Sequence, residues 1–180
     1  MPNWVYNIIK VYCKDDDNSK VVDFLKQHIN EYGIFDFNTV VPEPETQSEC
    51  PDKYNFNKQK GRYSKDKTTL ENPPERDWFN WYDWRVDNWG TKWNSGEEQC
   101  IDYDKVMEKC SVFNPVKIQF STAWSSPFLV FKKLYEMHPE LSIHVIYYSS
   151  ENGEYGELYS WNDKINHIRW ELDNYSESYL

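Results

Sequence analysis

One short segment of the chain combines side chains that are suited to binding a flat or anionic group. Residues 88–93, NWGTKW, place two indoles on either side of a hydroxyl and an ammonium. Indole rings stack on planar groups, Lys92 can pair with a phosphate, and Thr91 can donate a hydrogen bond. The alternative is that Trp89 and Trp93 pack the segment onto the rest of the fold, with Lys92 lying over their rings. The sequence leaves both interpretations open.

A second candidate segment, residues 124–127 with the sequence WSSP, is predicted to lie between a strand end and a helix start. Backbone N–H groups at a helix N-terminus attract anions, and the hydroxyls of Ser125 and Ser126 could add donors. Serine is also an ordinary helix cap, which needs no ligand. The order of elements permits this segment to face residues 88–93, and the two would then form one site.

The tryptophans just before residue 88 are predicted to differ in exposure. Helical spacing over residues 73–89 places one set of large side chains on one side, which we expect to pack inward: Trp78, Trp81, Tyr82, Arg85 and Trp89. Trp84 falls off this stripe, so it is predicted to be an exposed stacking surface. The candidate ligand-binding residues are therefore Trp84, Asn88, Trp89, Thr91, Lys92, Trp93, Trp124, Ser125 and Ser126.

The sequence offers no catalytic or metal-binding motif. Its six glycines form no phosphate-cradling loop, its four histidines share no ligand spacing, and its four cysteines show no CxxC pair. His28 is predicted to be a hydrogen-bonded core residue. We therefore expect a protein that is not an enzyme, with no catalytic residues, no metal site and no cofactor.

Hydrophobic periodicity predicts the elements that position these segments. Alternating residues predict strands at 4–13, 35–41, 116–122, 141–147, 156–161 and 165–170. Helical patterns predict one helix that runs to about Tyr32 and stops at Gly33, and another that starts at Ser126-Pro127 and closes at Pro139. The predicted fold class is α+β, with a ferredoxin-like split βαβ core formed by an antiparallel sheet with two helices. The predicted fold also contains a Trp-rich helical insertion and an extra C-terminal hairpin.

We expect a single ferredoxin-like domain over residues 1–180, with an insertion at 42–114 between its two βαβ halves. The insertion is predicted to comprise a long polar loop at 42–72, the Trp-rich helix at 73–89 and a short helix at 102–110.

Composition restricts the partners that such a domain could bind. Lys and Arg total 20 against 30 Asp and Glu, so the formal net charge is −10, which repels nucleic acids and anionic membrane surfaces at long range. Nucleic acid is thus an unexpected partner. The sequence contains no signal peptide and no bilayer-spanning apolar run, so we expect no membrane association and a location in the cytoplasm of a host cell. Aromatic residues make up 18% of the chain, including nine Trp and fourteen Tyr, a composition that favours a binding role.

Four strings in the sequence are distinctive: the opening MPNW, WYDWRVDNWGTKW at 81–93, STAWSSP at 121–127, and YYSSENGEYG at 147–156. Together they resemble the YubB-type ferredoxin-like domain family, accessory proteins of phages, prophages and plasmids. The resemblance implies a ferredoxin-like fold and a mobile-element origin, without a settled activity. Members similar to this chain often carry cysteine at the position of Val5, so no thiol chemistry is expected there.

Three functional hypotheses follow. The first is a non-enzymatic counter-defence protein of a phage or mobile element that sequesters a small nucleotide-derived ligand in a cleft between insertion and sheet. The alternative is an acidic protein–protein inhibitor that masks a basic nucleic-acid-binding surface of a host protein. A third, single-strand nucleic-acid binding on an aromatic sheet, conflicts with the net charge unless the five basic residues within 58–67 form a local basic loop. Each is compatible with a homo-oligomer.

Overall fold

The protein folds around a five-stranded antiparallel sheet with the strand order β2-β1-β3-β4-β5. The computed structural model describes residues 3–13, 18–56, 78–96, 114–151, 153–161 and 164–171. The strands are β1 (Trp4–Tyr12), β2 (Val116–Ala123), β3 (Ser142–Ser149), β4 (Glu154–Trp161) and β5 (Lys164–Glu171). As predicted, residues 4–13 supply a central strand, and the last two strands pair as a C-terminal hairpin.

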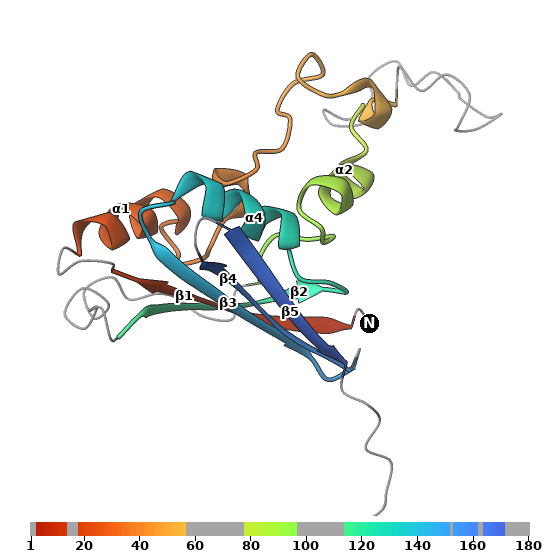
Figure 1. Ribbon diagram of the computed structural model, residues 1–180. Helices are drawn as coiled ribbons and strands as arrows, with labels where there is room; N and C mark the ends of the chain where they lie inside the picture. The colour runs from red at the N-terminus through yellow and green to blue at the C-terminus, as the bar shows by residue number, and fades with distance from the viewer. Residues whose placement is uncertain are drawn as a thin grey trace, which may run out of the picture.

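Two helices cover one face of this sheet (Figure 1). They are α1 (Ser19–His28) and α4 (Phe128–Met137), and a third described helix, α2 (Trp81–Asn88), lies beyond the end of the sheet near the start of α4. The buried core lies between the sheet and α1 and α4, where alternate strand residues such as Ile9, Ile118 and Val145 are all but inaccessible. The α+β class is therefore confirmed.

The complete ferredoxin-like arrangement is not confirmed, because one predicted strand is absent. The unit β2-α4-β3 is present, with β1 between its two strands, but residues 35–41 do not join the sheet. They form instead a 3-10 turn at Phe37–Thr39. The side chain of Asp36 accepts the backbone N–H of Asn38, and such local hydrogen bonds compete with a strand. Both phenylalanines of the segment are nevertheless buried, as their spacing indicated.

The first helix ends four residues before the predicted Tyr32. The side-chain oxygen of Asn30 accepts the backbone N–H groups of Tyr32 and Ile34, which turns the chain directly after α1. Gly33 follows in a left-handed conformation with φ of 77°. Tyr32 is consequently an exposed loop residue, and the prediction that the helix extends to it was wrong.

The Trp-rich helix begins later than predicted within the described residues. Asn80 accepts the backbone N–H of Asp83, which makes it the N-cap of α2, so residues 78–80 are not helical. Residues 57–77 and 97–113 lie outside the described residues, and with them the basic segment 58–67, most of the predicted polar loop, the predicted helix start at Pro73 and the predicted helix at 102–110. None of the helices in the described part of the chain is both long and apolar enough to span a bilayer.

Candidate functional site

The predicted exposure of the helical tryptophans is reversed for two of them. Trp84 is only 5% exposed and packs its ring against Phe79 and Trp89, whereas Trp81 and Tyr82 face outward. The side of α2 that carries Trp84 faces Phe79 and Trp89, whose rings cover the indole. Trp84 is therefore not an exposed stacking surface.

Three other predicted site residues fix the position of the 88–93 segment. The indole Nε1 of the fully buried Trp89 donates to the Val41 carbonyl at 2.8 Å. Asn88 Nδ2 donates to the Trp84 carbonyl at 2.8 Å, and the buried Thr91 hydroxyl donates to the Ala123 carbonyl at 2.9 Å. Thr91 thus ties the segment to the end of β2, Trp89 ties it to the loop after the 3-10 turn, and Asn88 bonds within α2. The packing interpretation therefore holds for Trp89 but not for the exposed Trp93.

The two serines before α4 are also engaged within the protein. Ser125 donates to the Gly90 carbonyl, and the buried Ser126 donates to Asn7 Oδ1 at 2.8 Å. Neither serine caps the helix, because the N-cap is Pro127 and no side chain bonds to the first amides. A Cβ at Gly90 would lie 3.5 Å from the amide nitrogen of Phe128, so residue 90 packs over the helix start where an anion was predicted to bind.

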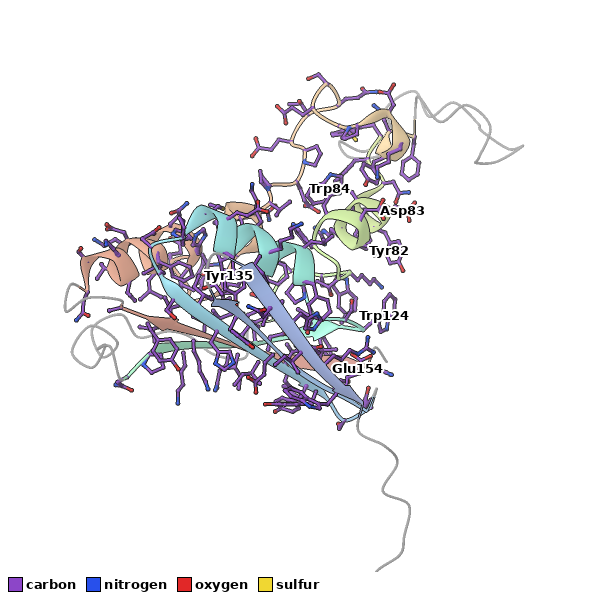
Figure 2. The ribbon with its side chains drawn as sticks, viewed as in Figure 1. Tyr82, Asp83, Trp84, Trp124, Tyr135 and Glu154 are labelled. Carbon is purple, nitrogen blue, oxygen red and sulfur yellow. The ribbon has the colours of Figure 1, made fainter. Side chains whose placement is uncertain are left out.

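The remaining predicted residues, Lys92, Trp93 and Trp124, form with Tyr82 an exposed group around one ammonium. We call Tyr82, Lys92, Trp93 and Trp124 the aromatic–lysine cluster. The Nζ atom of Lys92 lies 4.5 Å from the ring centroid of Trp93, 4.9 Å from that of Trp124 and 5.9 Å from that of Tyr82. Figure 2 shows Tyr82 on α2 directed toward Trp124 at the end of β2. The three rings are 38%, 36% and 45% exposed for Tyr82, Trp93 and Trp124, so part of each ring remains open to a ligand.

Charge and backbone strain distinguish this cluster from an ordinary surface patch. No carboxylate of the described residues lies within ion-pair distance of Lys92, although the chain is strongly acidic. Trp124 has a φ of 70°, the only positive value at a non-glycine residue in the described part of the chain. A left-handed conformation at a bulky residue costs about 1–3 kcal/mol, and such strain concentrates at functional sites.

Two rings of this region, Trp4 and Tyr82, were not predicted as site residues. Trp4 on β1 lies 6.1 Å, centroid to centroid, from Trp93 and extends the cluster onto the sheet. The alternation of β1 could have identified it, because Trp4 occupies the face opposite the buried Val5. Tyr82 was assigned to the buried stripe, and nothing local in the sequence indicates that it faces out.

A hollow of about 460 Å³ lies beside Trp84 and not beside Lys92. Its lining is acidic and proline-rich: Pro42, Glu43, Pro44, Glu45, Glu49, Pro51 and Trp84. Glu43 forms an ion pair with Arg85, and Glu49 accepts the backbone N–H groups of residues 45 and 46. Three carboxylates around the hollow would repel a phosphate, so an anionic ligand does not fit there.

The described residues contain no group of three or more His, Cys, Asp or Glu side chains placed to hold a metal ion. Cys13 and Cys50 are buried, and the other two cysteines lie outside the described residues. Comparisons with family models, curated proteins and solved structures found no match to this chain. The contacts and exposure of the described residues are therefore the basis for inferring its function.

Proposed function

We propose that the protein is a non-enzymatic binding protein that captures a small nucleotide-type ligand on the aromatic–lysine cluster. The observation that carries this proposal is the Lys92 ammonium, which lies between two partly exposed indoles and has no carboxylate partner among the described residues. A ligand with a flat base and a phosphate matches both features. The base stacks on the exposed face of an indole, and the phosphate pairs with the ammonium.

The strained backbone at Trp124 supports a role in binding over a role in packing. Its ring is 45% exposed, so nearly half of its surface makes no packing contact that could offset the unfavourable φ. A glycine at this position would adopt the same φ without strain. A tryptophan here is therefore explained better by what the ring contacts in a complex than by the stability of the fold.

Titration calorimetry with AMP, ADP-ribose and a cyclic dinucleotide tests this proposal. Stacking of a base on an aromatic ring contributes about 1–3 kcal/mol, so Trp124→Gly should weaken binding by roughly 5- to 100-fold while the protein stays folded. Lys92→Gln should weaken phosphate-bearing ligands and leave the free nucleoside unaffected. Tyr32→Ala, a change at an exposed tyrosine outside the cluster, is the matched control.

Absence of binding heat and of any thermal shift for all three ligands would rule out nucleotide capture. Equal binding by wild type and Trp124→Gly would rule out this cluster as the site. The finer assignments, a ferredoxin-like domain from a phage or mobile element with a counter-defence role in a host cytoplasm, remain part of the proposal and rest on the resemblance of the sequence strings.

A further inference from the structure

The face of the sheet opposite α1 and α4, which we call the open face, is lined by the outward residues of all five strands. Figures 1 and 2 show both helices on the other side, with strand side chains projecting from the open face. None of the described helices covers it. Because strand side chains alternate and the register is known, the residues that stand side by side on this face can be listed row by row.

An aromatic row crosses four adjacent strands of the open face. It consists of register partners on β1, β3, β4 and β5, namely Tyr6, Tyr148, Tyr155 and Trp170. The rings stack in two pairs: Tyr6 on Tyr148 at 5.0 Å, and Tyr155 on Trp170 at 5.1 Å between centroids. Tyr6, Tyr148 and Trp170 are exposed, so this surface consists of aromatic rings that contact solvent.

A basic row lies four residues further along the strands. Lys117 on β2 and Lys10 on β1 are direct register partners, and His144 on β3 is the next. Like charges directly opposite each other destabilise an antiparallel pair, and neither lysine has an ion pair among the described residues. Fold stability therefore does not account for two adjacent lysines at this position, whereas an anionic partner would.

The acidity of the chain is nearly absent from this face. Glu157 is the sole carboxylate among the described side chains of the open face, and it accepts hydrogen bonds from Tyr155 at 2.6 Å and His144 at 2.9 Å. The Tyr155 hydroxyl, then His144 and Lys10, keep the pKa of Glu157 below its usual value. Among the described side chains, two lysines stand against one carboxylate, so the described part of this face is locally positive in a chain of net charge −10.

We propose that the open face binds single-stranded nucleic acid, with bases on the aromatic row and phosphates at Lys10 and Lys117. The aromatic row spans three strand spacings, about 14 Å, and lies about 14 Å from the basic row, dimensions that fit a short strand of a few nucleotides. This surface is distinct from the aromatic–lysine cluster, although Trp4 connects the two, and the inference goes beyond mononucleotide capture. The net charge made nucleic acid an unexpected partner, but charge averaged over the chain does not describe this face.

A protein partner fits the charges less well. A protein interface would bury Lys10 and Lys117, and buried ammonium groups need carboxylate partners from that protein. A nucleic-acid strand supplies the anions itself, because its phosphates lie beside the bases that stack on the aromatic row. Affinity is expected to be micromolar at low salt, because the rest of the acidic chain repels the strand. With two phosphate contacts on a single strand, log K should fall against log salt with a slope of about −1.4.

Fluorescence anisotropy with labelled eight-residue oligothymidylate and oligouridylate tests the proposal, and the two probes separate DNA from RNA. Tyr148→Ala should weaken binding by roughly 5- to 100-fold. Lys10→Gln should reduce the steepness of the salt slope by about 0.7. Tyr32→Ala is the control, and circular dichroism checks that each variant is folded.

Absence of binding by both oligonucleotides at high micromolar protein would overturn the proposal. So would sedimentation of the wild type as a dimer that Tyr148→Ala converts to a monomer, because a second copy would then occupy the face. Failure here is distinguishable from failure of nucleotide capture. Trp124→Gly should weaken mononucleotide binding and Tyr148→Ala should preserve it, so each surface is tested by its own variant and its own probe.

Discussion

Mild acid should destabilise this protein through His28, a fully buried residue of α1. Its Nδ1 lies 2.8 Å from the Thr39 hydroxyl, which itself donates to the Asp36 carbonyl, so Nδ1–H must be the donor to Thr39. The Nε2 atom faces His138 Nε2, 2.7 Å away, and His138 Nδ1 lies 3.2 Å from the Glu140 carboxylate. Burial of the ring, and then the charge of His138, disfavour a proton on His28, so the folded state favours the neutral His28 ring.

The magnitude follows from the pKa of His28. Burial, and then the charge of His138, lower this pKa from 6.5 to about 4. At about 1.4 kcal/mol per pH unit, the difference corresponds to about 3 kcal/mol of unfolding free energy. Since the unfolded chain takes up the proton first, this stability is fully present above pH 6.5 and is lost as the pH falls from 6.5 to 4. About 2 kcal/mol should be lost by pH 5.

Urea unfolding at pH 7.5 and pH 5.0 measures this loss in the wild type and in His28→Gln. The wild type should lose about 2 kcal/mol more than the variant. Burial, and then Arg169, also lower the pKa of His167, but that contribution is common to both proteins and cancels. An equal loss in the two proteins would refute the reasoning, as would an NMR titration of wild-type His28 with a midpoint near 6.5, which needs no variant.

Two further predictions concern packing, and urea unfolding at pH 7.5 measures both. Gly156→Ala should destabilise the protein by about 1–3 kcal/mol, because the added Cβ would overlap the Tyr147 hydroxyl group. Gly96→Ala is the control. Its added Cβ would meet only the Ser121 carbonyl oxygen at 3.5 Å, so the unfolding free energy should change little. Trp89→Ala should cost about 3–5 kcal/mol, because it removes a fully buried ring and the hydrogen bond that anchors the end of α2. Tyr32→Ala, at a residue that is 68% exposed, is the control for Trp89→Ala and should change the unfolding free energy by less than about 0.5 kcal/mol. Comparable losses in Trp89→Ala and Tyr32→Ala would contradict the prediction for Trp89.

Local pattern sufficed to predict most of the sheet and the buried face of each strand. The alternation of residues 4–13 predicted a strand there, which is confirmed as β1, a strand with a neighbour on each side whose Val5 and Val11 face the core. A residue period of two determines the buried face without reference to distant residues. His28 was likewise identified correctly as a hydrogen-bonded core histidine from its place on the apolar stripe of α1.

The candidate site was predicted in part, for a reason that concerns α2. Its residues are large and aromatic on several sides, so helical spacing could not indicate which side packs inward. Contacts with residues outside α2 determine which side of the helix packs inward: Phe79 packs against Trp84, and the Val41 carbonyl accepts a hydrogen bond from Trp89. Trp84 is buried and Tyr82 is exposed for that reason.

The amino-acid sequence by itself determined all five strands of the sheet to within a few residues, which strand faces are apolar, and that the chain carries aromatic rings in excess of a core; it wrongly indicated a strand at 35–41. Only the tertiary structure decided where those rings gather. The aromatic row joins strands whose residues lie up to 164 positions apart, from Tyr6 to Trp170, and pairing register between such strands depends on the whole sheet. Lys92 meets Trp124 because Thr91 and Ser125 bind the two segments together across the end of β2, contacts that no local spacing encodes.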